Sequence, residues 1–213
     1  MKDLYENLRD SYKEKNIAKI KNNINHILNN LLNTDFLEQN LRYHPLGFIY
    51  CRLHEFENKE NIRLHIWNKF SNIQTSSMDK HNHFYDVNSY VVKGQIINTL
   101  YALKEDEDIN YYQYKGSYIN SDKRILTKTN IGNKLIKISS TIINCGEFYR
   151  IPKEHIHSGG AIGESITITY SENPENPTPL IFGEIDGENE YIYESQKVSN
   201  SIVKYIRSQI TGT

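Results

Sequence analysis

Residues 81–94 read HNHFYDVNSYVVKG and residues 146–157 read GEFYRIPKEHIH, and both stretches contain pairs of histidines. His81 and His83 are two positions apart, just before a run rich in β-branched and aromatic residues. Side chains alternate between the two faces of an extended strand, so both imidazoles are expected on one side. His157, at the end of the second stretch, offers a third imidazole from another strand. The pattern predicts a metal site made of three histidines.

The chain from residue 45 onward consists of short runs of β-branched and aromatic residues, separated by clusters of Asn, Gly, Asp and Lys. Strands are expected at 48–53, 62–67, 87–92, 95–101, 111–114, 135–143, 148–151, 165–170 and 180–182. We also expect a turn at Gly94 and a loop at 158–161. Many short strands without helices between them predict an antiparallel sandwich or barrel.

Helices are expected at the two ends of the chain. Between residues 16 and 33 apolar residues recur at steps of three and four, which predicts an amphipathic helix. This helix either packs against the outside of the barrel or forms a dimer contact. A shorter helix is expected at 35–41 and a last one at about 197–210. The expected organisation is an N-terminal helical extension at 1–44, a β-barrel at 45–185 and a C-terminal strand and helix at 186–213.

The two histidine stretches resemble the two motifs of the cupin superfamily. The first motif of that family holds HxH, an acidic residue and a glycine, and the second holds a glycine, a proline and a histidine. The matching positions here, after the HxH, are Gly94, Gly146, Pro152 and His157. The resemblance implies a mainly β cupin barrel, also called a double-stranded β-helix or jelly roll. It selects His157 as the third ligand, with His155 as the second choice.

The ligand set departs from the common cupin pattern at one position. Counted back from Gly94, the family's glutamate ligand falls at Val87, which cannot coordinate a metal. Three neutral imidazoles leave about three open positions on an octahedral ion, which suits Fe(II), and nitrogen ligands also accept Ni, Cu or Zn. Open positions allow a chelating substrate and O2 to bind side by side, and the charge of the ion attracts an anionic donor such as a thiolate.

Among cupins, the three-histidine pattern is similar to that of thiol dioxygenases, in particular cysteine dioxygenase. Arg52, in the segment Tyr-Cys-Arg, matches the arginine with which that family holds the substrate carboxylate, and Tyr170 matches its active-site tyrosine. The resemblance implies a non-haem iron oxygenase with Arg52 as substrate-binding residue and Tyr170 as catalytic residue. Ile166 and Ile168 stand where cysteine dioxygenase has a serine and a histidine, so the resemblance does not identify cysteine as the substrate. The expected substrate is a small polar molecule, which could be a thiol or an amino-acid-like compound.

Other function classes stay open at this point, because cupin folds host many reactions. One alternative is an isomerase, lyase or hydroxylase of a biosynthetic pathway, which oxygen consumption would separate from an oxygenase. Another is a non-catalytic cupin that binds a metabolite, which predicts no turnover with any redox metal.

Composition limits the partners. Twenty-five Lys and Arg residues nearly balance 26 Asp and Glu residues, and the formal charge of -1 gives no reason to expect nucleic acid or an anionic membrane. Cys51 and Cys145 give no disulfide framework, and no apolar run approaches the roughly 20 residues that span a bilayer. We therefore expect a cytoplasmic protein that binds a small molecule, with a homodimer as an open question.

Overall fold

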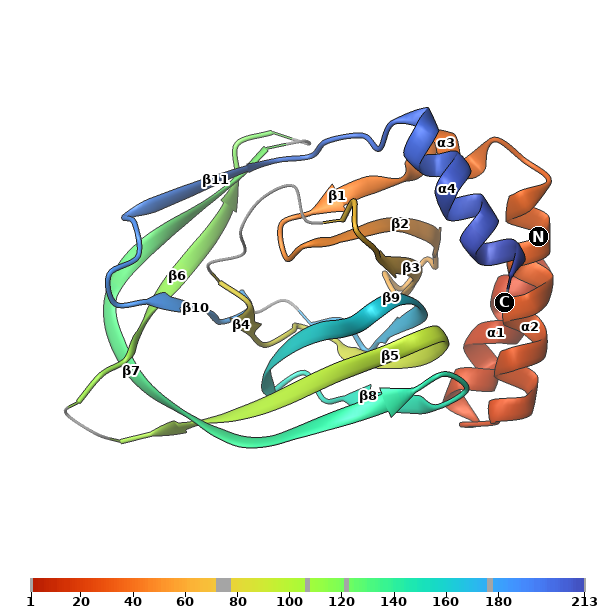
Figure 1. Ribbon diagram of the computed structural model, residues 1–213. Coiled ribbons are helices and arrows are strands. Elements are labelled where there is room, and N and C mark those ends of the chain that lie inside the picture. Colours follow the sequence, from red (N-terminus) through yellow and green to blue (C-terminus); the bar gives the residue numbers. More distant parts are fainter. Residues whose placement is uncertain (1, 72–77, 106–107, 121–122, 176–177, 213) are drawn as a thin grey trace.

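The computed structural model describes residues 2–71, 78–105, 108–120, 123–175 and 178–212. Helices α1 (Lys2–Lys13), α2 (Ile17–Leu32) and α3 (Phe36–Asn40) precede the strands, and α4 (Asn200–Thr211) follows them. The strands between them are antiparallel and curl into a barrel, with the helices gathered at one side (Figure 1). The mainly β, antiparallel barrel with helices at both ends that the sequence predicts is thus confirmed. None of the described helices is long and apolar enough to cross a membrane.

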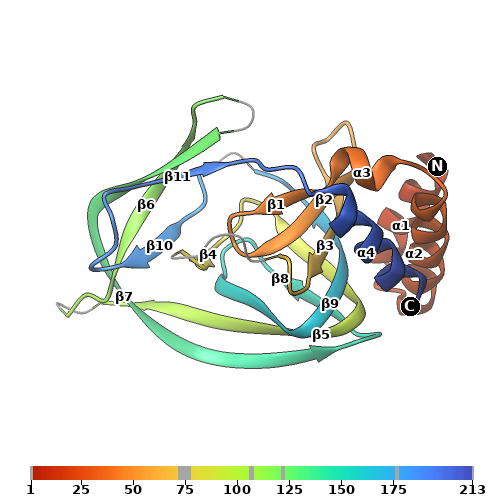
Figure 2. The same ribbon diagram turned by 45° about the horizontal axis from the view of Figure 1, so that its top comes forward.

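The strands form one continuous sheet. They are β1 (Arg42–His44), β2 (Phe48–Glu55), β3 (Asn61–Trp67), β4 (Lys80–His81), β5 (Asp86–Lys104), β6 (Tyr111–Tyr118), β7 (Lys123–Asn144), β8 (Phe148–Ile151), β9 (Ile156–Glu172), β10 (Ile181–Glu184) and β11 (Glu190–Glu194). β5 pairs with β9 along most of its length and with β8 and then β7 on its other side. β9 also pairs with β3 and β4, and Figure 2 shows these strands around the interior of the barrel.

Strand β5 continues through Gly94, where the sequence predicts a turn. Gly94 has φ +74, and a Cβ atom there would lie 2.3 Å from the Glu164 carbonyl oxygen. The pairing with β9 shifts register between Val91 and Gln95, so the chain bends at a bulge and then continues in the same strand. The predicted turn at Gly94 is therefore wrong, and a β-bulge is found in its place. A glycine with positive φ occurs in bulges as well as in turns.

The stretch 158–161, expected as a loop, lies inside β9. Ser158 pairs with Thr99 and Ala161 with Ile96, both on β5. Serine and glycine have weak strand propensity, but pairing with a long neighbouring strand overrides that local preference. Helix α1 and strands β1 and β4 are further elements that the sequence pattern did not predict, whereas β11 is a strand in the C-terminal segment where one was expected.

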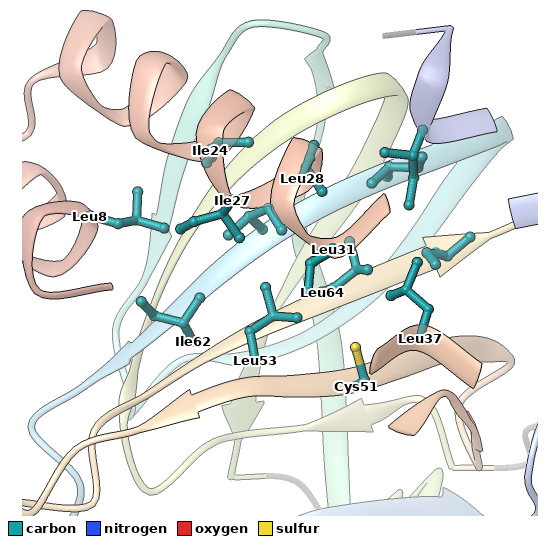
Figure 3. Packing of buried hydrophobic residues seen from close by; sticks show 14 of the residues in the cluster. Leu8, Ile24, Ile27, Leu28, Leu31, Leu37, Cys51, Leu53, Ile62 and Leu64 are labelled. Carbon is teal, nitrogen blue, oxygen red and sulfur yellow. The ribbon is translucent and has the colours of Figure 1, made fainter. Parts of the chain in front are cut away.

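The main hydrophobic core lies between the helices and the outer face of the barrel. Asn16 caps α2 by accepting a hydrogen bond from the Lys19 amide at 3.1 Å. The apolar side of α2 is buried together with residues of β2 and β3, as Figure 3 shows for Leu31, Leu53 and Leu64. Of the two uses left open for this helix, packing on the barrel is the one observed. Side chains on the opposite face of β2 and β3 are directed away from the helices, toward the interior.

Candidate metal centre

The histidines of the two sequence motifs meet where β4 joins β9. His81 ends β4 and is the direct cross-strand partner of His157 on β9. His83 follows two residues after His81 in an extended connection to β5. β4 lies between β9 and β10 in the sheet, so its only two residues are held from both sides (Figure 1).

The three imidazoles face one another closely. One nitrogen from each of His81, His83 and His157 lies within 4.8 Å of the others, and the ring centroids are 4.7 to 5.1 Å apart. Such a group has the composition and spacing to hold a metal ion. His157 is buried, whereas His81 and His83 keep part of their surface accessible.

Hydrogen bonds determine which nitrogen is free in two of the three rings, those of His81 and His157. His81 Nδ1 donates to the Asp79 carbonyl oxygen at 2.9 Å, and His157 Nδ1 donates to Asn98 Oδ1 at 2.9 Å. A proton on Nδ1 leaves Nε2 with a lone pair in the neutral ring. A partner on the far nitrogen is the usual arrangement around metal-binding histidines, where it fixes the tautomer and the ring orientation.

Two of these nitrogens come nearly into ligand geometry. His83 Nε2 lies 2.9 Å from His157 Nε2. Two nitrogens at right angles around one ion, each at about 2.1 Å from it, lie about 3.0 Å apart. Nitrogen lone pairs at this separation repel unless a proton or a metal ion is shared between them. The donor set therefore fits a metal that prefers nitrogen ligands.

Burial keeps these imidazoles neutral. It lowers the pKa of His83 and of His157 well below the ordinary 6.5, and the charge of neighbouring histidines lowers both pKa values further. Burial also lowers the pKa of His81, although the bond to the Asp79 carbonyl acts in the opposite direction. The neutral form is the one that binds metal.

A carboxylate ligand is not found where the common cupin pattern has one. Val87 lies in an apolar cluster with Tyr85 and Ile151. The neighbouring Asp86 accepts hydrogen bonds from the Arg150 side chain at 2.8 Å and from the Lys153 amide at 3.0 Å. Within the described ranges, the group of candidate ligands at this position consists of histidines alone.

The other residues selected from the sequence lie elsewhere. His155 is exposed in the turn before β9 and is not part of the histidine group. Arg52 on β2 is 54% exposed in its side chain and forms an ion pair with Glu55. No contact of the described residues links either side chain directly to His81 or His83.

Tyr170 lies on the helix side of β9. It is fully buried, its ring stacks on Tyr12 of α1 at 5.7 Å, and its hydroxyl donates to Glu60 Oε2 at 2.6 Å. The structure therefore does not bring Tyr170 to the histidines, and it places this side chain in the contact between β9 and α1. The physical reason is strand alternation, which turns Tyr170 outward together with Ile166 and Ile168.

Sequence reasoning missed three residues around the histidines. Asn98 orients His157, the Tyr85 ring stacks on His83 at 4.9 Å, and Arg63 donates to the Tyr85 hydroxyl at 2.9 Å. Tyr85 lies two residues after His83, and strand alternation could have predicted that both side chains lie on the same side. Asn98 and Arg63 come from other strands, and no spacing in a single sequence connects them to the histidines.

The similarity that this chain shows to known proteins is structural and weak. No family model and no curated protein matches the chain. Solved structures that match include hydroquinone 1,2-dioxygenase from Sphingomonas sp. TTNP3 with 4-hydroxybenzoate bound, at TM-score 0.32 and 13% identity over 55% of this chain and 60% of that chain. A structure of the DMSP lyases RdDddP and RnDddQII matches at TM-score 0.34 and 10% identity, over 62% and 51%. Protein SO0799 from Shewanella oneidensis matches at 0.34 and 13%, over 84% and 90%. The chain thus spans about 60% and 51% of the length of the first two.

Proposed function

We propose that His81, His83 and His157 bind one divalent metal ion and that the protein is a metal-dependent enzyme. The observation that carries this proposal is the approach of His83 Nε2 to His157 Nε2, at 2.9 Å, with His81 beside them. Fe(II) is the proposed ion because three nitrogen ligands leave about three octahedral positions open. Ni, Cu and Zn accept the same donors and are the competing ions in any loading experiment.

The proposed reaction is oxygenation of a small polar molecule, with a thiol or an amino-acid-like compound as substrate class. When bound, Fe(II) with open positions supplies a common binding point for the substrate and O2. The chain contributes orientation, because the Asp79 carbonyl and the Asn98 amide hold two of the rings. Holding both reactants at one place replaces a bimolecular encounter by proximity. The similarity of the sequence motifs to those of thiol dioxygenases supports the choice of thiols.

Metal content tests the site. The protein is purified without chelator and without nickel affinity resin, and metals are measured by mass spectrometry together with His81→Ala and His155→Ala. We expect about one equivalent of metal in the wild type and in His155→Ala, and a strong loss in His81→Ala. If no metal binds even after anaerobic reconstitution with Fe(II), the proposed site is refuted.

Oxygen uptake tests the reaction separately. Iron-loaded protein is screened with thiols and amino acids in an oxygen electrode, with His157→Ala as the matched variant. Uptake that depends on both substrate and His157 would support oxygenation. Full iron loading with no uptake for any compound would refute the oxygenase while leaving the metal site in place.

A further inference from the structure

A pocket opens beside Trp67, away from the histidines. Its volume is about 380 Å³, and it is lined by Trp67 on β3, Ala161 on β9 and Gly47 in the turn between β1 and β2. Small-molecule sites in proteins usually have volumes of about 300 to 1,000 Å³. The pocket is therefore large enough for one ring of a small molecule.

Trp67 gives this pocket an aromatic wall. Leu64 and Ile66 are buried in the core under the helices, as Figure 3 shows for Leu64, so strand alternation turns Trp67 to the inside of the barrel. The centroid of the Trp67 ring lies 5.2 Å from that of Phe48 and 5.9 Å from that of His65. All three residues are half-buried, so the contacts among the rings do not cover them completely.

Two charged residues also line the pocket, and both are bound to other groups. Glu164 accepts a hydrogen bond from the Tyr205 hydroxyl of α4. The Lys69 ammonium lies 5.1 Å from the centroid of the Phe70 ring and 5.2 Å from that of Tyr205. The surface at Trp67 is therefore aromatic and uncharged, and a second aromatic ring is the group that stacks best on it.

One face of β9 connects this pocket with the metal centre. His157, Gly159 and Ala161 share that face, because β9 pairs with β5 in unbroken register over these residues. Trp67 and Ala161 pack against the same apolar cluster. Four residues of extended strand, from His157 to Ala161, span roughly 13 Å. The pocket and the histidines thus lie at two ends of one short stretch of strand.

Gly159 leaves the space between the two ends open. It is exposed, and a Cβ atom at this position would meet no atom of the described residues within 4 Å. Because Gly159 lies between His157 and Ala161 on the shared face, a molecule bound at the metal centre can extend over it to Trp67.

We propose that the pocket at Trp67 binds an aromatic ring of the substrate, while a donor group at the other end of the same molecule reaches the metal over Gly159. This inference rests on the proposed metal-dependent function and narrows its substrate class to elongated molecules with a terminal aromatic ring. The length of β9 between the two ends requires a separation on the order of 10 Å between the ring and the donor group.

The test uses Co(II)-loaded protein and three thiols, which are 2-mercaptoethanol, hexane-1-thiol and 6-phenylhexane-1-thiol. Binding is read from thiolate-to-cobalt absorption. We expect the phenyl thiol to bind about tenfold more tightly than hexane-1-thiol, and this preference to be lost in Trp67→Leu. Trp67 is the single tryptophan of the chain, so its emission in Zn(II)-loaded protein should change with the phenyl thiol and stay constant with 2-mercaptoethanol.

Two neighbouring glycines give a matched pair of variants. Gly159→Val places a side chain between the metal centre and Trp67, whereas Gly160→Val places it on the opposite face, where a Cβ atom also meets no atom of the described residues within 4 Å. We expect Gly159→Val to weaken binding of both long thiols by about tenfold or more, with Co(II) uptake and 2-mercaptoethanol binding retained. Gly160→Val should bind all three thiols as the wild type does.

The outcomes separate the ring subsite from the metal site. A wild type that binds Co(II) and thiols without preferring the phenyl thiol would overturn the subsite and leave the metal site in place. A preference that persists in Trp67→Leu, or an equal loss in Gly159→Val and Gly160→Val, would also overturn it. Failure of the wild type to take up Co(II) would instead refute the metal-dependent function, and the ring subsite would be refuted with it.

Discussion

Asn98 and His157 are joined by a hydrogen bond of 2.9 Å between Asn98 Oδ1 and His157 Nδ1. Asn98 belongs to β5 and His157 to β9, two strands that pair along most of their length. The bond places the proton of His157 on Nδ1 and leaves Nε2 directed at His83. One pair of strands thus supplies both a candidate ligand and the group that orients it.

Replacing Asn98 should weaken metal binding without removing a ligand. Asn98→Leu deletes the acceptor and frees the His157 ring, so we expect metal affinity to fall about 10- to 100-fold. Affinity is measured by competition with a chromogenic chelator. Asn98→Asp keeps an acceptor at the same place and should retain most of the affinity. An equal loss in both variants would show that the bond does not act through orientation.

Acid should destabilise the metal-free protein from about pH 6.5 downward. Burial lowers the pKa of His44, His83 and His157 well below 6.5, and it lowers the pKa of His65 to about 3. Below pH 6.5 the unfolded chain takes up protons on these groups and the folded protein does not. The unfolded state then binds more protons, so the free energy of unfolding falls by about 1.4 kcal/mol per pH unit for each such group.

The measurement is urea unfolding of chelator-treated protein from pH 8 to pH 5, for the wild type and His65→Gln. The difference in the free energy of unfolding between the two proteins at pH 8 gives the cost of the substitution itself. We expect the slope below pH 6.5 to be smaller by about 1.4 kcal/mol per pH unit in the variant. Identical slopes would mean that His65 is protonated in the folded protein.

The placement of the histidines followed from sequence because their spacing obeys strand alternation within each motif. The residues around the histidines could not be predicted in this way, because their positions depend on which strands become neighbours. Arg52 and Arg63 are cross-strand partners on β2 and β3, and the ladder shifts register directly after Arg52. The sequence gives no indication of that bulge, nor that Glu55 pairs with Arg52. The bulge at Gly94 could not be predicted either, because a glycine with positive φ is equally typical of a turn.

Tyr170→Phe should affect stability and leave the metal centre unchanged. The substitution removes the hydroxyl that donates to Glu60, whose side chain is only 3% exposed and also forms an ion pair with Lys13 at 3.4 Å. A buried group that loses a hydrogen bond costs about 1 to 3 kcal/mol. We expect that loss in urea unfolding together with unchanged metal content. Tyr12→Phe, which deletes the bond to the Ile168 carbonyl, is the matched control on the same interface. Normal stability with lost oxygen uptake would restore a catalytic role for Tyr170.

Helix α2 offers a last prediction, because its apolar face had two uses open from sequence alone. Leu31 is fully buried against the barrel, whereas Ile17 at the start of the same helix is 49% exposed. Leu31→Ala should lower the free energy of unfolding by about 2 to 5 kcal/mol, since it removes packing contacts and leaves a cavity. Ile17→Ala should change it by less than about 0.5 kcal/mol. Urea unfolding at several protein concentrations checks both values. If the face formed a dimer contact instead, the loss in Leu31→Ala would depend on protein concentration, because dissociation and unfolding would then be coupled.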